Sequence, residues 1–111
     1  MSDQHTALHT ALINSLARHQ GAQAGVSAQT LAAQLGLSPR TLRRLVSDCR
    51  AEGMPICGHP STGYFVANTA AELAQSIAFL EHRALHSLRL LCRMRNVSMP
   101  ELLGQLKLTQ A

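Results

Sequence analysis

Helix boundary signals are unusually explicit in the first half of the chain. A helix expected over residues 28–35 is followed by Gly36, which readily adopts the left-handed conformation that ends a helix. Ser38 is a good N-cap for the next helix, and Pro39 fits its first position, where a backbone N–H needs no partner. The spacing predicts two consecutive helices joined by a tight turn, with the later one running over residues 39–52.

The helix expected over residues 39–52 has two different faces. At about 100° per residue, one side is apolar and consists of Leu42, Leu45, Val46 and Cys49. The opposite side is polar and consists of Arg40, Arg43, Arg44 and Ser47, with Thr41 at its edge. Guanidinium groups bind phosphates, or the O6 and N7 atoms of guanine, through paired hydrogen bonds. The alternative is a solvated charged face without a partner.

The apolar positions of both helices match the helix-turn-helix pattern. Leu31, Leu35 and Leu37 are apolar, and Ala32 is small where the two helices should cross. In this pattern the second helix enters a DNA major groove. We therefore predict DNA contacts from the residues at the start and on the polar face of that helix: Ser38, Pro39, Arg40, Thr41, Arg43, Arg44 and Ser47.

Residues 54–67 predict a β-hairpin. Two short strand candidates, 55–58 and 63–67, flank a segment rich in turn-forming residues. Residues 53–71 contain no charged residue, so this hairpin offers phosphate only backbone amides and the polar side chains of His59, Ser61 and Thr62. We expect the helix over 39–52 to supply most of the electrostatic affinity, and Phe65 to enter the core.

A helix expected over residues 3–20 completes this region, with an apolar stripe of Leu8, Leu12, Ile13, Leu16 and Ala17 and with Gly21 as its C-terminal cap. Roughly residues 5–67 resemble a winged helix-turn-helix domain, similar to small bacterial regulators of the DeoR type and to the N-terminal domain of biotin operon repressors. The resemblance rests on LAAQLGLSPRTLRRLV and on Gly53 followed by Gly63-Tyr64-Phe65. It implies a DNA-binding domain over 1–67, with the wing on adjacent backbone or minor groove.

The rest of the chain, residues 68–111, is predicted to be a helical segment for dimerisation or interaction. Thr69 with Glu72, and Ser98 with Glu101, form capping boxes for a long helix ending near residue 95 and a short last helix ending near residue 108. The long helix can be written in heptads with Ala70 at position a. We expect a homodimer through an apolar face that contains Leu73, Ile77, Leu80, Ala84, Leu88, Leu91 and Met94. The alternative is a helix packed wholly on its own domain.

Histidines and arginines on the long helix leave two further alternatives open. His82 and His86 are four residues apart, as are His5 and His9, and such pairs can share a metal ion if a third ligand is present. The sequence places no third ligand beside either pair, so we expect no metal and no cofactor. The arginines Arg83, Arg89, Arg93 and Arg95 complement the helix dipole or provide a second phosphate contact.

Composition limits the remaining function classes. The net charge of +4 and the pI near 9.6 suit a polyanionic partner, while 3% aromatic residues argue against a stacking platform for single strands. We expect no membrane span and no signal peptide, and three cysteines without a CxxC motif suit a reducing cytoplasm. No catalytic constellation is evident, so we expect no enzyme.

The sequence therefore predicts a mainly α protein with a small β-hairpin, in which a long helix and a short last helix follow a winged helix-turn-helix. The predicted function is a small cytoplasmic regulator of bacterial or prophage type that binds double-stranded DNA as a homodimer. Two alternatives remain. One is a protein-interaction module in a replication or transcription assembly. The other is a metal-responsive regulator that uses His82 and His86.

Overall fold

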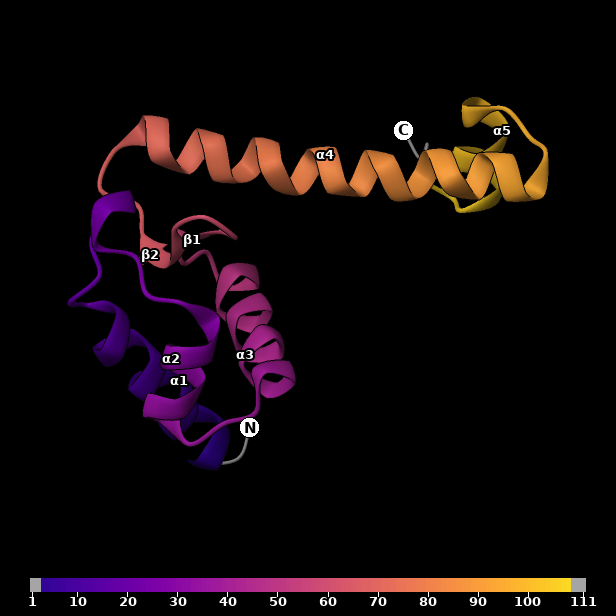
Figure 1. Cartoon of the computed structure of the whole chain (residues 1–111). Helices are drawn as coiled ribbons and strands as arrows, with labels where there is room; N and C mark the ends of the chain where they lie inside the picture. Colours follow the sequence, from indigo (N-terminus) through magenta and orange to yellow (C-terminus); the bar gives the residue numbers. More distant parts are fainter. Residues whose placement is uncertain (1–2, 109–111) are drawn as a thin grey trace. The chain divides into compact units, whose positions relative to one another are not determined.

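A computed structural model describes the backbone of residues 3–108 and the side chains of residues 6–108. The chain is mainly α-helical with one two-stranded antiparallel hairpin, as predicted (Figure 1). The elements in chain order are α1 (Asp3–Leu16), the 3-10 turn η1 (Ala22–Ala24), α2 (Ala28–Leu35), α3 (Pro39–Ala51), β1 (Ile56–His59), β2 (Gly63–Val66), α4 (Ala70–Arg95) and α5 (Met99–Gln105).

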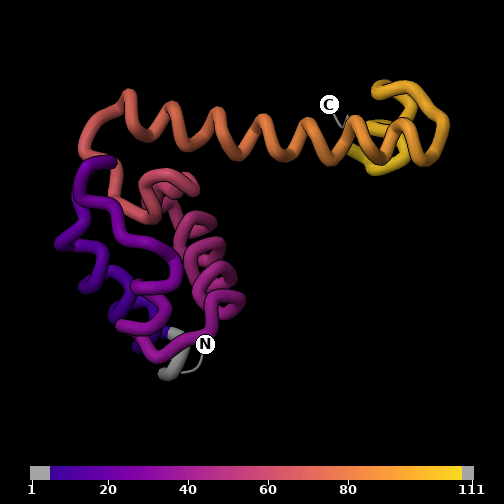
Figure 2. Tube along the Cα trace, in the orientation of Figure 1, coloured from indigo at the N-terminus to yellow at the C-terminus, as the bar shows by residue number. Residues whose placement is uncertain are grey.

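The chain divides into two compact units, Met1–Ser76 and Ile77–Ala111. The first unit contains the three N-terminal helices, the hairpin and the first two turns of α4. The second contains the remainder of α4 and the short helix α5. The trace in Figure 2 shows that α4 runs without a break from one unit into the other.

The predicted boundaries of α2 and α3 are confirmed. The Ser27 hydroxyl accepts a hydrogen bond from the Thr30 N–H at 3.1 Å, and Gly36 ends α2 in the left-handed region at φ 67°. The Ser38 hydroxyl accepts from the Thr41 N–H at 3.1 Å, and Pro39 is the first residue of α3. Local capping chemistry therefore positions the two helices, and the left-handed glycine allows the chain to reverse between them.

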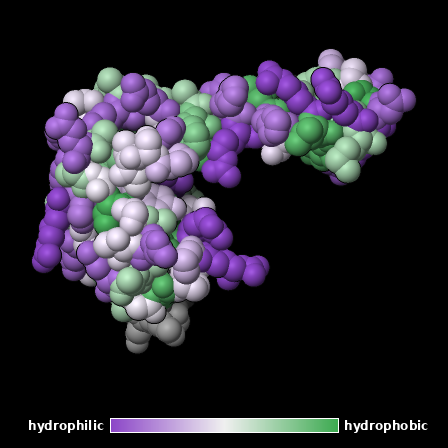
Figure 3. Space-filling model, viewed as in Figure 1, coloured by the Kyte–Doolittle hydropathy of each residue, from purple (hydrophilic) through white to green (hydrophobic). Residues whose placement is uncertain are grey.

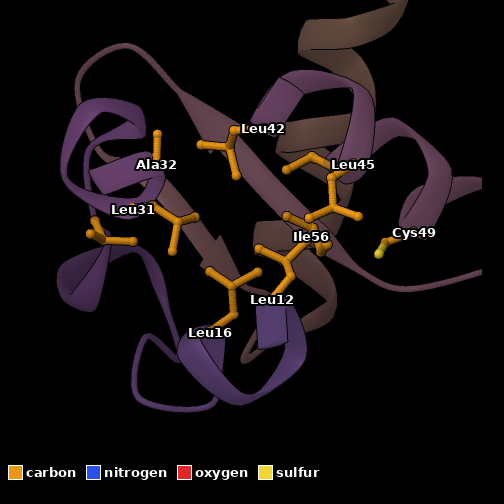
Figure 4. Close-up of a cluster of buried hydrophobic side chains, with 10 residues drawn as sticks. Leu12, Leu16, Leu31, Ala32, Leu42, Leu45, Cys49 and Ile56 are labelled. Carbon is orange, nitrogen blue, oxygen red and sulfur yellow. The ribbon is translucent and has the colours of Figure 1, made fainter. Parts of the chain in front are cut away.

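The core of the first unit lies where α1, α2 and α3 meet the first hairpin strand. Figure 4 shows the apolar side chains of these elements converging from several directions. Leu12, Leu16, Leu31 and Leu42 are fully buried, and Ala32 of α2 belongs to the same cluster. Phe65 is also buried, as predicted. This packing fixes the orientation of α3, so its opposite face points to solvent.

The first helix is shorter than predicted. It ends at Leu16 rather than near residue 20, and Ile13 of the expected apolar stripe is 44% exposed. Gly21 does not cap this helix, because it precedes η1 with φ 89° and ψ 156°, a conformation that other residues rarely adopt. The reason is tertiary: the segment after the helix pairs with the hairpin at two points.

That pairing connects residues 19–26 to the second strand of the hairpin. Val66 donates its N–H to the His19 carbonyl at 2.8 Å, and Gly21 donates to the Val66 carbonyl at 2.9 Å. Further along, Val26 and Tyr64 exchange two backbone hydrogen bonds of 2.8 and 2.7 Å. Two isolated bridges on either side of η1 therefore hold the hairpin on its β2 edge, which the sequence pattern did not predict.

Glu72, in the first turn of α4, joins that helix to the same connector. Its carboxylate accepts hydrogen bonds from the Ala22 N–H at 2.7 Å and from the Asn68 N–H at 2.8 Å. The Thr69 hydroxyl accepts from the Glu72 N–H at 3.1 Å, which confirms the predicted N-cap. The hydrogen bond from the Ala22 N–H, and to a smaller extent the one from Asn68, lower the pKa of Glu72 because they favour the ionised carboxylate.

In the second unit, α5 folds back on the end of α4. The Ser98 hydroxyl caps α5 by accepting from the Glu101 N–H at 3.3 Å, as predicted. Leu102 is fully buried, and the Cys92 thiol lies 3.9 Å from the Met99 sulfur. This packing covers one side of α4 with apolar groups and leaves its other sides exposed.

Candidate nucleic-acid interface

The outer face of α3 carries three exposed arginines. Leu42, Leu45, Val46 and Cys49 all point into the core, so the α3 faces predicted from the sequence are confirmed. On the solvent side Arg40, Arg43 and Arg44 are exposed, as is Ser47. Within residues 6–108, none of these arginines forms an ion pair or hydrogen bond with the protein. Their guanidinium groups are therefore available to an external anion.

The N-terminal turn of α3 starts with a side-chain cap. The Ser38 hydroxyl donates to the Thr41 hydroxyl at 2.9 Å while it accepts from the Thr41 N–H. Pro39 is exposed beside them and supplies no N–H. Because Ser38 is occupied as the cap, its first role is to fix the start of α3, and the arginines that follow carry the free charge.

The fourth arginine of α3, Arg50, differs from the other three because its side chain contacts the hairpin. Its Nε donates to the Ile56 carbonyl at 2.8 Å, and its Nη2 lies close to Gly58 in the same strand. The Tyr64 ring covers Gly58 from the neighbouring strand, at a distance that leaves little room for a Cβ at that position. Arg50 therefore fixes the hairpin to the end of α3, which sets where the hairpin stands relative to the exposed arginines.

The predicted wing residues lie together at the tip of the hairpin. His59 is the last residue of β1, and Ser61 and Thr62 lie in the turn that follows it. The His59 Nδ1 atom lies 2.7 Å from the Ser61 hydroxyl and accepts from the Ser61 N–H at 3.1 Å. His59 and Ser61 are exposed, and Thr62 is half-buried. The tip is thus an ordered polar turn.

The predicted dimer residues on α4 differ in exposure. Ile77 is 53% exposed, Leu80 is 41% exposed and Met94 is 84% exposed. Ala84 is exposed as well, whereas Leu73, Leu88 and Leu91 are half-buried. In Figure 3 hydrophobic and hydrophilic residues both reach the surface of the region formed by α4 and α5. The long helix therefore has apolar side chains that its own unit does not cover.

Histidines and cysteines form no candidate metal site in the part of the chain that the structure describes. The side chain of His5 lies outside the described residues, and His9 is buried in the first unit with its Nδ1 atom 3.3 Å from the Glu52 carboxylate. Cys49, Cys57 and Cys92 are free thiols. Burial raises the pKa of Cys49 and of Cys57, which favours the neutral thiol.

Comparison with known proteins bears on the first unit. A family model described as an HTH domain matches residues 16–65. Residues 16–65 are a helix-turn-helix domain. The match begins at the end of α1 and includes α2, α3 and the hairpin, so the helix-turn-helix domain has the small hairpin that is typical of the winged form. Comparisons with curated proteins and with solved structures return no match.

The helix-turn-helix domain is a DNA-binding module, and its match covers both the arginines of α3 and the tip of the hairpin. The match does not extend to α4 or α5. Among the described residues, no helix combines the length and the apolar character that crossing a membrane requires.

Proposed function

We propose that this protein is a transcriptional regulator of bacterial type that binds double-stranded DNA by inserting α3 into the major groove. The observation that carries the proposal is the outer face of α3, where Arg40, Arg43 and Arg44 are exposed and have no partner among the described residues. An α-helix fits the major groove, and an arginine fork can hydrogen-bond to guanine or clasp a phosphate. Free guanidinium groups on a helix held rigidly from behind are suited to that role.

The hairpin tip has a smaller part in this proposal. Residues 53–71 contain no charged group, so His59, Ser61 and Thr62 contribute hydrogen bonds to the DNA backbone without releasing many counterions. The tip therefore positions the domain along the duplex, and α3 provides most of the salt-dependent affinity.

Titration of binding against salt tests both assignments. Removing one phosphate contact reduces the slope of log K against log salt by about 0.9. We expect Arg43→Gln or Arg44→Gln to produce that change on a random-sequence duplex if the residue contacts phosphate. A residue that contacts a base instead relaxes the sequences selected from a random pool, at about 1–3 kcal/mol per position.

Arg18→Gln is the matched control, because Arg18 is exposed in the same unit but follows α1 and is not part of α3. It removes the same charge and should leave the slope unchanged. A joint change of His59, Ser61 and Thr62 to Ala should lower the slope less than Arg43→Gln does. Normal DNA binding by the charge-reversed Arg43→Glu protein would disprove the proposal for α3.

The same proposal includes a homodimer formed through α4. Ile77, Leu80, Ala84 and Met94 are exposed, and they recur at the a and d positions of one heptad frame. A heptad seam is complementary to a copy of itself, so the simplest partner for this face is a second chain. Two copies also place two reading helices on a site with two halves, which increases affinity for DNA.

Sedimentation of the full chain at high micromolar concentration tests the dimer. Leu80→Gln should dissociate it, because Leu80 is 41% exposed within one chain and lies in the seam. Leu90→Gln is the control, since Leu90 is 49% exposed but lies outside the a and d positions. A wild-type monomer under these conditions would exclude the dimer while leaving the role of α3 intact. Free cysteines suit a cytoplasmic location for such a regulator.

A further inference from the structure

The long helix carries a basic stripe, which we define as His82, His86, Arg89 and Arg93. Successive members are separated by four, three and four residues, so at about 100° per residue all four fall within an arc of roughly 60°. All four side chains are exposed. Over this span α4 rises by roughly 16 Å, at about 1.5 Å per residue.

Among the described residues of the second unit, nothing neutralises the basic stripe. The helix α5 contacts other sides of α4, through Cys92 with Met99 and through Arg95, whose Nη1 donates to the Gln105 side chain at 3.0 Å. Glu81 lies about 100° round the helix from His82. Within residues 6–108, neither Arg89 nor Arg93 has a hydrogen bond or an ion pair with the protein.

The other two arginines of α4 are placed differently. Arg83 lies over the Phe79 ring, with 5.9 Å between the guanidinium carbon and the ring centroid, and Arg95 is bonded to α5. The helix dipole accounts for basic residues in the last turn, which here are Arg93 and Arg95. It does not account for Arg89 or for the two histidines, which lie further from the C-terminus.

We propose that the basic stripe of α4 is a second DNA contact, which binds the phosphate backbone of a duplex without reading its sequence. Duplex DNA presents one negative charge per about 1.7 Å of its axis, so a stripe roughly 16 Å long meets several phosphates. Imidazole and guanidinium N–H groups both donate to phosphate oxygen. In the heptad frame of α4 these residues occupy the c and f positions, opposite the seam, so a dimer leaves the stripe accessible.

This inference rests on the proposed DNA-binding function, and its test separates the two. The full chain is titrated into a fluorescently labelled random-sequence duplex over a range of salt concentrations. The double variant Arg89→Gln with Arg93→Gln should lower the slope of log K against log salt by about 1.8 per protomer, which corresponds to affinity up to about 60-fold weaker at 0.1 M salt.

Two further variants control for folding and for overall charge. Arg83→Gln with Arg95→Gln removes the same charge from the same helix but not from the stripe, and should leave the slope unchanged. Arg89→Lys with Arg93→Lys keeps the charge and should restore most of the slope. The change to Gln costs little helix propensity, so the fold should survive, as circular dichroism can verify.

Each other outcome contradicts the inference. Equal slope changes in the two Gln pairs would indicate a general effect of net charge, and no change in either would remove the stripe from the interface. Vesicles containing phosphatidylserine and phosphatidylcholine in equal amounts form a parallel arm. If the stripe variant no longer bound vesicles but kept the DNA slope, the partner would be an anionic membrane. A wild-type chain that bound no duplex would refute the proposed function itself.

Discussion

Replacing Gly25 with alanine should weaken the attachment of the hairpin to the connector that follows α1. Gly25 has φ −61° and ψ 152°, an ordinary extended conformation, so alanine causes no backbone strain there. Space is the constraint, because a Cβ on Gly25 would lie 2.0 Å from the carbonyl oxygen of Thr62. The substitution therefore tests the packing of connector against hairpin and not the flexibility of glycine.

The cost follows from how far the hairpin must move. Ordinary van der Waals contact begins at 3.4 Å, so the Thr62 carbonyl must retreat by roughly 1.4 Å. The adjacent pair of hydrogen bonds between Val26 and Tyr64, 2.8 and 2.7 Å long, should break first. Two hydrogen bonds contribute about 1–3 kcal/mol, and the stiffer unfolded chain returns about 0.4–1 kcal/mol. We expect a net destabilisation of about 1–2 kcal/mol.

Urea unfolding of the full chain, followed by circular dichroism, measures this destabilisation, and the melting temperature should fall by about 5–15 °C. Gln23→Ala is the matched control, because Gln23 is exposed in the same connector and should change stability by less than about 0.5 kcal/mol. A Gly25→Ala protein as stable as the wild type would refute the close packing of the connector on the hairpin.

Three further changes test the core, the connector and the thiols. Leu42→Ala, at a fully buried site, should lower the free energy of unfolding by about 2–5 kcal/mol in urea titrations. The pKa of Glu72 is lower in the folded protein than its ordinary value of 4.5, so the ionised carboxylate stabilises the fold above pH 4.5. This stabilisation is lost as the pH falls through the pKa of Glu72 in the folded state. The stability of Glu72→Gln should therefore depend less on pH in this acidic range. Cys92 is half-exposed, whereas Cys49 and Cys57 are buried and burial raises the pKa of their thiols. Cys92 should therefore react with a thiol reagent faster than the other two cysteines, and Cys92→Ser should remove the fast phase of that reaction.

Helix boundaries and the faces of α3 could be predicted because the signals for both are local. Ser38 caps α3 and Gly36 ends α2 through interactions within a few residues, so their chemistry can be recognised in the sequence alone. The side of α3 that holds Leu42 had to be the buried one, which left the arginines outside. The predicted reading face is therefore a consequence of where the core lies.

The pairing between residues 19–26 and β2 could not be predicted, because it joins segments about forty residues apart. Gly21 carried a signal, but a glycine after a helical stripe reads equally well as a helix cap. Likewise the local pattern around Glu72 predicts a capping box, whereas its second role as an acceptor for the Ala22 N–H depends on tertiary placement. In both cases the local sequence is compatible with more than one local conformation. A hydrogen bond to a backbone group far along the chain selects the conformation that forms.

The charge distribution assigns different tasks to the parts of the interface. Arg50 bonds to the Ile56 carbonyl, so one basic residue of α3 holds the hairpin in place, while the exposed arginines have no partner in the part of the chain that the structure describes. In the proposed binding mode, an uncharged hairpin tip gives orientation with little affinity of its own. If the basic stripe of α4 adds affinity without sequence preference, the specificity of the protein depends on the outer face of α3 alone. Changes to the stripe should then weaken binding equally on all sequences, whereas changes on α3 should alter which sequences are bound.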